Sequence, residues 1–220
     1  MSCVSRRRAV RTSGLLALIA ACAFAAAPSA VGRTRPPTAN GAPCEDCHGA
    51  QGEGAPLAAI PRLAGQSADY LAKQLRDYEN GSRESPVMRN FARGLSDSER
   101  AQLGSYYASL SAPYAAQVAP DNPPKIDARQ LVRGRQLATQ GAEPQRVQAC
   151  DNCHGPEGSG LPYLAPYLAG QSAEYLENQL KAWQQGTRKN DGGKLMVTVV
   201  KRLSSADITA VSAYFASLGK

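Results

Sequence analysis

The segment CEDCHGAQGEG covers residues 44–54, and the segment CDNCHGPEGSG covers residues 150–160. Each segment holds two cysteines separated by two residues, a histidine directly after the second cysteine, and a glycine after the histidine. The two histidines of the 220-residue chain, His48 and His154, both lie in these segments. The same combination of residues at the same spacing therefore occurs twice, and it indicates how the whole chain is organised.

The duplication extends beyond these segments. LAGQSADYLAKQLRDYENGSR at residues 63–83 aligns with LAGQSAEYLENQLKAWQQGTR at residues 168–188, at an offset of 105. YYASL at residues 106–110 aligns in the same way with YFASL at residues 214–218, at an offset of 108. Similarity at a nearly fixed period is typical of repeated structural units. We therefore predict two tandem domains of similar fold.

The sequence divides into a predicted signal peptide, a first domain, a Pro/Ala-rich linker and a second domain. These parts cover residues 1–30, 31–110, 111–125 and 126–220, respectively. Four arginines in the first eleven residues precede an apolar stretch at 14–27 that ends in small residues, which is typical of a secretory signal. That stretch is shorter than the roughly 20 residues that a membrane span needs. We expect a periplasmic protein, with lipid attachment at Cys22 and membrane association as the alternative.

Charge and composition exclude some classes of protein. The formal net charge of +7 falls to +3 once residues 1–30 are set aside, because they hold four arginines and no acidic residue. No dense cluster of Lys and Arg with interleaved aromatic residues is present, so we expect no binding to nucleic acid. Aromatic residues make up only 6% of the chain. Any core must therefore be built largely from Ala, Leu and Tyr.

Each repeat is predicted to be helical. Ser67 and Ser172 are candidate N-caps, each followed by a helix that ends at Gly81 or Gly186. The apolar residues within these two helices recur at i, i+4 and i+7, the spacing of one helix face. They are Leu71, Leu75 and Tyr78 in the first repeat, and Leu176, Leu180 and Trp183 in the second.

A further helix is expected near the end of each repeat, beginning after Ser96 in a capping box with Glu99 and after Ser204 in the second copy. Only the second repeat has an amphipathic segment before its cysteines, at residues 127–140. No segment alternates as a strand does, so the predicted fold is all-α, with two domains joined by a linker. Without that extra helix, we expect the first domain to be the less stable one.

All cysteines beyond residue 30 belong to the two repeated motifs: Cys44, Cys47, Cys150 and Cys153. The C-x-x-C-H sequence is the attachment motif of c-type haem. Two thiols at this spacing can each add to one of the two vinyl groups of a haem, and the adjacent histidine is then directed at the iron. The motifs therefore predict two covalently attached haem c groups, with His48 and His154 as axial ligands.

Three other interpretations of the cysteines fit less well. Paired C-x-x-C motifs in zinc ribbons lie roughly 15–20 residues apart, whereas these lie in different repeats. A thioredoxin-like motif lies near a βαβ pattern, which is absent from this sequence. Structural disulfides would account for the cysteines of an exported chain but not for the duplicated histidine.

The repeated unit, with LAGQSA followed by YL and QL after each C-x-x-C-H motif, resembles the di-haem cytochrome c4 family over nearly all of residues 40–220. This resemblance implies two class I cytochrome c domains, each with an axial methionine between its two main helices. Met88 and Met196 match that place, and we expect both to lie in loops. The alternative is that these methionines fill gaps in the core.

The resemblance also assigns roles to residues beside the haem. A proline at about the distance of Pro61 and Pro166 offers its carbonyl to the second ring nitrogen of the histidine, although a plain turn proline is the alternative. Arg83 and Arg188 are candidates to pair with haem propionates, whereas solvated arginines are commoner. Tyr78 and Trp183 could pack at the haem edge, with ordinary core packing as the more common role.

Histidine–methionine ligation raises the reduction potential and fills both axial positions of the iron. We therefore expect an electron-transfer protein rather than an enzyme. It would carry single electrons between a respiratory donor, either a quinol-oxidising cytochrome complex or a dehydrogenase, and a terminal oxidase or reductase. One alternative is an electron-transfer haem subunit of a dehydrogenase complex, for example a flavin-linked sulfide dehydrogenase. A di-haem peroxidase is a further alternative, but it needs an iron with an open or displaceable position.

Overall fold

The computed structural model describes residues 44–55, 59–111, 127–163 and 165–218. The predicted signal peptide, Cys22 and the start of the first domain lie outside these residues. So does almost all of the predicted linker, and with it any test of whether the first repeat has a helix before Cys44. None of the described helices is both long enough and apolar enough to cross a membrane.

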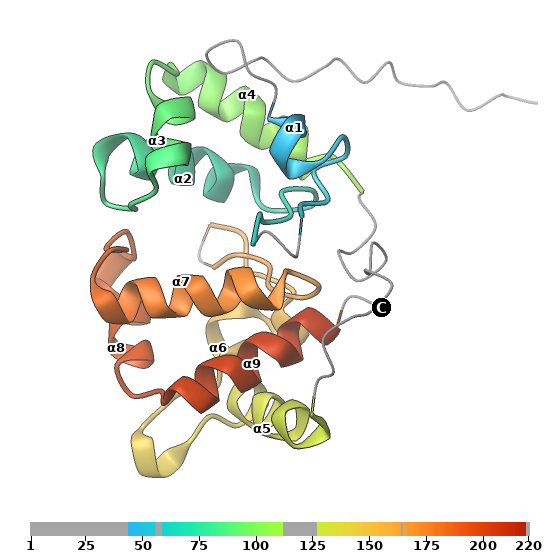
Figure 1. Cartoon of the computed structure of the whole chain (residues 1–220), viewed down its shortest axis with the longest axis vertical. Coiled ribbons are helices and arrows are strands. Elements are labelled where there is room, and N and C mark those ends of the chain that lie inside the picture. Colours follow the sequence, from blue (N-terminus) through green and yellow to red (C-terminus); the bar gives the residue numbers. More distant parts are fainter. Residues whose placement is uncertain (1–43, 56–58, 112–126, 164, 219–220) are drawn as a thin grey trace, which may run out of the picture. The chain divides into compact units, whose positions relative to one another are not determined.

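The described residues form helices and turns, and they contain isolated β-bridges in place of strands. The first repeat contains α1 (Glu45–His48), α2 (Ala68–Asn80), α3 (Pro86–Ala92) and α4 (Asp97–Ala108). The second repeat contains α5 (Ala128–Thr139), α6 (Asp151–His154), α7 (Ala173–Gln185), α8 (Leu195–Val200) and α9 (Ser205–Ser217). Short 3₁₀ turns lie at Glu143–Gln145, Pro156–Gly158 and Gly192–Lys194. The all-α prediction is confirmed (Figure 1).

The predicted helix starts are confirmed at the level of individual hydrogen bonds. The hydroxyl of Ser67 accepts from the backbone N–H of Tyr70, and Ser172 accepts in the same way from Tyr175. Ser96 forms the expected capping box with Glu99. The helix after Ser204 begins with a capping box too, in which Asp207 takes the place of glutamate. These caps satisfy backbone donors that the first turn of a helix leaves free.

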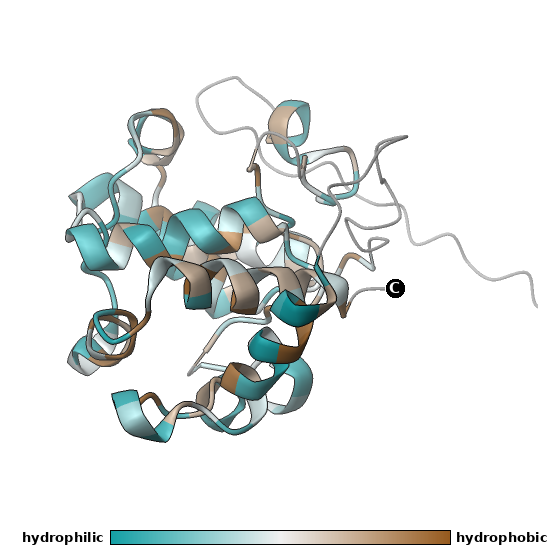
Figure 2. Cartoon of the chain, turned by 60° about the horizontal axis from the view of Figure 1, so that its bottom comes forward, coloured by the Kyte–Doolittle hydropathy of each residue, from teal (hydrophilic) through white to brown (hydrophobic). Residues whose placement is uncertain are grey.

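Each repeat encloses a small hydrophobic core of its own. The first is made of Ala64, Leu71, Leu95, Leu103, Tyr107 and Leu110. The second is made of Leu137, Ala138, Ala142, Val147, Leu176, Leu203, Ile208, Val211, Tyr214 and Phe215. Helices in Figure 2 carry both hydrophilic and hydrophobic segments, as expected where one face packs inward. The predicted apolar faces of α2 and α7 each supply residues to these cores.

Close helix crossings depend on two glycines. A Cβ atom at Gly104 in α4 would lie 2.4 Å from the carbonyl oxygen of Ala68, at the start of α2. A Cβ atom at Gly134 in α5 would lie 2.2 Å from the carbonyl oxygen of Ala210 in α9. No side chain fits at such distances, so each glycine lets two helix backbones meet directly.

The prediction that both methionines lie in loops is wrong. Met88 lies in α3 and Met196 in α8, both short helices. In α3, Ser85 acts as N-cap and Pro86 occupies the first turn, where proline needs no N–H partner. The sequence pattern missed these helices because six or seven residues are too few to show a clear period.

Candidate haem-binding site

Both C-x-x-C-H motifs fold into a single helical turn, α1 in the first repeat and α6 in the second. The backbone N–H of each histidine donates to the carbonyl of the first cysteine of its motif, at 2.9 Å in both copies. The turn brings each histidine inside, and both His48 and His154 are buried. Gly49 and Gly155, which follow, have φ of 82° and 73°, a region that favours glycine.

None of the four cysteines of these motifs forms a disulfide within the described residues. Among the described residues, no three His, Cys, Asp or Glu side chains are grouped so that they could hold a metal ion by themselves. Burial, and to a smaller extent Asp151, raises the pKa of the Cys150 thiol to about 12, so this thiol is neutral at physiological pH. The geometry thus supports neither the zinc nor the disulfide interpretation.

The two histidines are held in one defined tautomer. Nδ1 of His48 lies 2.9 Å from the carbonyl oxygen of Pro61, and Nδ1 of His154 lies 2.9 Å from that of Pro166. Because a carbonyl only accepts hydrogen bonds, Nδ1 carries the proton and donates it. The expected role of the two prolines is confirmed, and it leaves Nε2 of each ring with a free lone pair.

Burial lowers the pKa of both histidines below the ordinary value, although the proline carbonyls oppose this effect. Each ring is therefore neutral at physiological pH. A neutral imidazole with its proton on Nδ1 is the form that binds iron through Nε2. Both sites have the same arrangement, so the repeat duplicates a complete histidine site.

Met88 and Met196 are half-buried and occupy corresponding short helices of the two repeats. In both cases the residue before the methionine is a large exposed hydrophobic side chain, Val87 in the first repeat and Leu195 in the second. Their assignment as iron ligands stays a prediction.

The arginines expected to be solvated are buried. Arg83 is 3% exposed and Arg188 is 4% exposed, and the two form an antiparallel β-bridge that joins the repeats. The guanidinium of Arg83 stacks on the ring of Tyr78 at 4.6 Å, and that of Arg188 stacks on the ring of Trp183 at 3.9 Å. The two aromatic rings thus support the arginines, and Trp183 is itself a buried residue of the core.

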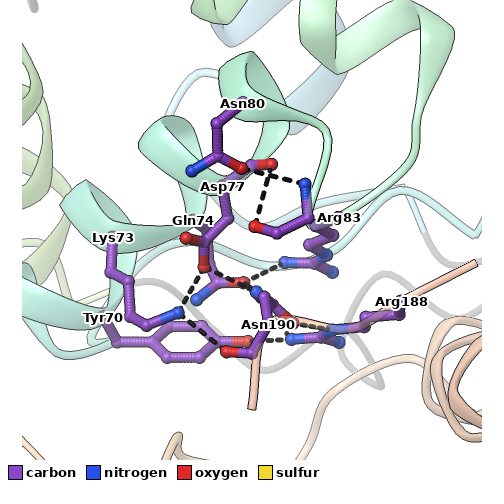
Figure 3. A network of polar contacts seen from close by, with 9 residues as sticks. Tyr70, Lys73, Gln74, Asp77, Asn80, Arg83, Arg188 and Asn190 are labelled. Atoms are coloured by element: carbon purple, nitrogen blue, oxygen red, sulfur yellow. Dashed lines mark hydrogen bonds and ion pairs between the residues drawn. The ribbon is translucent and has the colours of Figure 1, made fainter. Parts of the chain in front are cut away.

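A polar network surrounds these two arginines (Figure 3). Arg83 donates across the interface to the hydroxyl of Tyr175 and to Oε1 of Gln179, both at 2.6 Å. Arg188 donates in the opposite direction to the hydroxyl of Tyr70 and to Oε1 of Gln74, both at 3.2 Å. The two sets of contacts are equivalent, because Tyr175, Gln179 and Arg188 lie 105 residues after Tyr70, Gln74 and Arg83.

Backbone contacts across the interface follow the same rule. The N–H of Glu84 donates to the carbonyl of Thr187 at 3.1 Å, and the N–H of Lys189 donates to the carbonyl of Ser82 at 2.7 Å. Such reciprocal pairs, in which residue i contacts j and the equivalent of j contacts the equivalent of i, are typical of a twofold interface between identical chains. The two repeats of this chain thus meet as two subunits of a symmetric dimer would.

One part of the network lacks this symmetry. Lys73 forms an ion pair with Asp77 and donates to the carbonyl of Asn190 at 2.8 Å. The side-chain amide of Asn190 donates to the same carboxylate at 2.7 Å (Figure 3). The second repeat has Asn178 and Ala182 where the first has Lys73 and Asp77, so this ion pair belongs to the first repeat alone.

The arginine network fits a haem. Within the described residues, neither Arg83 nor Arg188 forms an ion pair with a carboxylate. Burial alone would lower the pKa of Arg83, but the hydroxyls of Tyr175, Tyr78 and Tyr70 raise it above the ordinary value, so the group keeps its charge. The indole Nε1 of Trp183 is also buried, and it has no hydrogen-bond partner in the described part of the chain. Buried positive charge without an anion is costly, and the propionates of haem are anions of the right kind.

Sequence reasoning missed the residues that join the repeats. They are Gln66, Tyr70, Gln74 and their equivalents Gln171, Tyr175 and Gln179. A signal was present, because these polar residues are identical in both copies, although Lys73 and Asp77 nearby are not. When two diverged repeats keep identical polar residues, those residues are candidates for a contact between the repeats. The apolar periodicity of a helix gives no information about such polar positions.

Comparisons with known proteins agree with this geometry. A family model described as Cytochrome c matches residues 131–219. The thiosulfate dehydrogenase electron acceptor of Stutzerimonas stutzeri is 41% identical and covers 80% of this chain and 79% of its own length. The protein of the same name from Thiomonas intermedia is 38% identical, with coverages of 95% and 89%. Cytochrome c4 of Pseudomonas aeruginosa is 35% identical, with coverages of 82% and 86%.

Two solved structures are similar as well. Reduced recombinant cytochrome c4 from Pseudomonas stutzeri has a TM-score of 0.67 and 33% identity, over 80% of this chain and 93% of that one. Thiosulfate dehydrogenase from Marichromatium purpuratum, in its as-isolated form, has a TM-score of 0.74 and 38% identity. The match covers 84% of this chain and 39% of that longer chain.

Proposed function

This chain belongs to the cytochrome c4 family of di-haem c-type cytochromes, and from that premise we propose that it carries electrons in the periplasm from a thiosulfate-oxidising dehydrogenase to a terminal oxidase or reductase. It binds two covalently attached haem c groups and is an electron carrier. The dehydrogenase partner is supported by the two relatives named as thiosulfate dehydrogenase electron acceptors. The periplasmic location is supported by the character of residues 1–30.

In this proposal each motif holds one haem. Cys44 and Cys47 hold the first through thioether bonds, and Cys150 and Cys153 hold the second. His48 and His154 bind iron through Nε2, because their Nδ1 protons are committed to Pro61 and Pro166. This list of residues is the one that the C-x-x-C-H motifs predict.

Met88 and Met196 would supply the second axial ligand of each iron. A haem with both axial positions filled supplies reversible one-electron exchange without binding a substrate. The protein residues contribute a fixed histidine orientation, and the two buried arginines offset the charge of the propionates. Because the arginines lie in the contact between the repeats, this contact would supply the positive charge that offsets the propionates of both haems.

The observation that carries the partner assignment is the 41% identity to a thiosulfate dehydrogenase electron acceptor over most of both chains. To test it, the oxidised holoprotein is mixed with purified thiosulfate dehydrogenase and thiosulfate, and haem reduction is followed by absorbance. We expect both haems to be reduced within the turnover time of the enzyme. Mixtures without enzyme or without thiosulfate serve as controls. Reduction by a flavin-linked sulfide dehydrogenase with sulfide, but not by the thiosulfate enzyme, would replace this partner with the other.

A fixed complex is the second candidate, and one observation favours it. In the solved thiosulfate dehydrogenase of Marichromatium purpuratum, the region similar to this chain is 39% of a longer chain, so such a domain also occurs joined to other sequence. Size-exclusion chromatography of the holoprotein with the dehydrogenase separates the two arrangements. Free elution at micromolar concentration supports a mobile carrier, and stable co-elution supports a subunit.

A further inference from the structure

Two buried glutamines, Gln66 and Gln171, reach across the contact between the repeats. Each one connects its own repeat with the histidine site of the other repeat. Gln171 is 6% exposed, and its side chain lies against the backbone of Arg62 in the first repeat. Gln66 is 7% exposed, and its side chain lies against the backbone of Tyr167 in the second repeat. Arg62 and Tyr167 are the residues that directly follow Pro61 and Pro166. The glutamines therefore reach across the interface to the segments that hold the histidines.

Each glutamine binds its target residue at two points. The N–H of Arg62 donates to Oε1 of Gln171 at 3.0 Å, and Nε2 of Gln171 donates to the carbonyl of Arg62 at 3.0 Å. The N–H of Tyr167 donates to Oε1 of Gln66 at 3.0 Å, and Nε2 of Gln66 donates to the carbonyl of Tyr167 at 3.0 Å. An amide group matched to both the donor and the acceptor of one residue fixes that residue in position.

The glutamines are themselves held at the start of a long helix. Oε1 of Gln171 also accepts from the N–H of Ser172, and Oε1 of Gln66 also accepts from the N–H of Ser67. Both serines are the N-caps of α7 and α2. Each glutamine thus ties the first turn of a helix in its own repeat to the histidine segment of the other.

One peptide group joins the histidine to the glutamine. In the peptide between Pro61 and Arg62, the carbonyl accepts from Nδ1 of His48, and the N–H donates to Gln171. In the peptide between Pro166 and Tyr167, the carbonyl accepts from Nδ1 of His154, and the N–H donates to Gln66. Hydrogen bonds at the two ends of one amide polarise each other and strengthen together.

We propose that Gln66 and Gln171 are positioning residues that act crosswise: Gln171 tunes the haem bound by His48, and Gln66 tunes the haem bound by His154. Each acts by polarising a proline carbonyl and thereby the imidazole that donates to it. A stronger hydrogen bond from Nδ1 makes the ring a more basic ligand. More basic ligands favour ferric iron, so both glutamines lower the potential of the haem held in the opposite repeat. This inference rests on the proposed function insofar as His48 and His154 are the iron ligands.

The test replaces each glutamine in turn with methionine, which has a similar length and no hydrogen-bonding amide. The holoproteins Gln171→Met and Gln66→Met are oxidised stepwise, and NMR follows the two haems separately. We expect Gln171→Met to raise the potential of the haem of His48, and Gln66→Met to raise that of the haem of His154. The two variants control for each other, since both loosen the same interface and only the responding haem should differ.

A second measurement keeps the proposal testable if either variant shifts both potentials. The solvent exchange rate of the Nδ1 proton of each histidine is measured by NMR in the reduced protein. Loss of one supporting hydrogen bond should speed exchange about fivefold at the histidine across the interface and leave the other unchanged. Lys73→Met, which removes the contact of Lys73 with the carbonyl of Asn190 across the interface, should leave both protons unchanged.

The proposal is overturned if both variants shift the same haem, if both haems shift equally and the two protons exchange alike, or if neither haem responds. These outcomes are separate from failure of the proposed function. A wild-type protein without histidine ligation would show this in its own spectrum, and reduction by the dehydrogenase does not depend on either glutamine.

Discussion

Gly104 in α4 and Ser212 in α9 occupy equivalent positions of the two repeats. Different pairs of helices are in close backbone contact in the two cores. In the first repeat, the missing side chain lets α4 meet the start of α2 with its backbone. In the second repeat, a serine that is 1% exposed occupies this position, and its hydroxyl has no hydrogen-bond partner among the residues that the structure describes. There α5 crosses the other side of α9 at Gly134. Each repeat therefore has its own close crossing, made between different helices.

The interface between the repeats, unlike the helix crossings inside them, uses the same contacts in both copies. Cross-repeat contacts of Gln66, Tyr70, Gln74, Arg83 and the backbone of Ser82 each have a counterpart 105 residues later. Inside each repeat, neighbouring residues of the same repeat can change to fit a substituted side chain. At a reciprocal interface, a change must fit the other repeat as well, so the two copies keep the same polar residues.

The largest expected effect comes from filling the crossing of the second repeat. Gly134→Leu forces a side chain against the carbonyl of Ala210 and should cost about 3 kcal/mol, at the upper end for overpacking. In the wild type, we expect slower amide exchange in residues 168–218 than in residues 63–110. The substitution should reverse this order, which hydrogen exchange of the holoprotein measures.

Gly192→Ala is the control for that variant, because among the described residues a Cβ at Gly192 would meet no atom within 4 Å beyond its own chain neighbours. It should leave both exchange profiles unchanged. An unaltered profile in Gly134→Leu would mean that α5 does not brace the second core. Faster wild-type exchange in residues 168–218 than in 63–110 would contradict the assignment of the first domain as the less stable one.

The next effect concerns the interface. Arg83→Lys keeps the charge but cannot reproduce the planar contacts with Tyr175, Gln179 and the Tyr78 ring. Leaving buried polar groups unpaired should cost about 2 kcal/mol. Exchange at the backbone N–H of Glu84 and Lys189, which bond across the interface, should then become faster.

Arg129→Lys provides the comparison for that variant, since its side chain is almost fully exposed in α5. A surface change of this kind should stay within about 0.5 kcal/mol. Equal effects of the two substitutions on the Glu84 and Lys189 amides would show that the buried arginine does not hold the repeats together.

The smallest effect compares the two capping boxes. Burial raises the pKa of Asp207, but hydrogen bonds from Arg133 and Ser204 outweigh this and hold the pKa below its ordinary value. A carboxyl group whose pKa is lowered by folding stabilises the protein above its unfolded pKa, and this contribution is lost as pH falls through the folded pKa. Asp207→Asn should therefore cost about 1 kcal/mol at neutral pH.

Chemical unfolding of wild type and Asp207→Asn at several pH values checks the sign. The difference between the two proteins should be constant near neutral pH and should shrink once the pH falls below the ordinary carboxyl range. Glu99→Gln, in the exposed capping box of the first repeat, serves as the comparison because the pKa of Glu99 is lowered mainly by hydrogen bonds from Ser96, whereas Arg133 bonds directly to Asp207. A difference for Asp207→Asn that grows on acidification would contradict the lowered pKa.

Much of this structure could be predicted from the sequence. Serine caps, glycine stops and apolar faces placed α2, α4, α7 and α9, because these signals are local to each helix. The roles of Pro61 and Pro166 were expected from the resemblance and are confirmed. The motif helices α1 and α6, and the helices of the two methionines, were missed because they are too short to have a period.

The burial of Arg83 and Arg188 could not be read from local sequence, since an isolated arginine after a helix is usually solvated. Each arginine is buried largely by the other repeat, through the β-bridge between Arg83 and Arg188 and through a tyrosine hydroxyl of that repeat. The same holds for Gln66 and Gln171, whose partners are backbone atoms that carry no signal in the side-chain pattern. Contacts between repeats are thus the part that local patterns do not encode.

The most direct test of the account is the optical spectrum of the oxidised holoprotein, scaled to its haem content. The weak long-wavelength band that reports methionine sulfur on ferric iron should have the intensity expected for two such ligands per chain. Met88→Leu and Met196→Leu should each remove half of it. A wild-type band with half the expected intensity would mean that one iron lacks a methionine ligand, and a di-haem peroxidase would then explain the protein better than an electron carrier does.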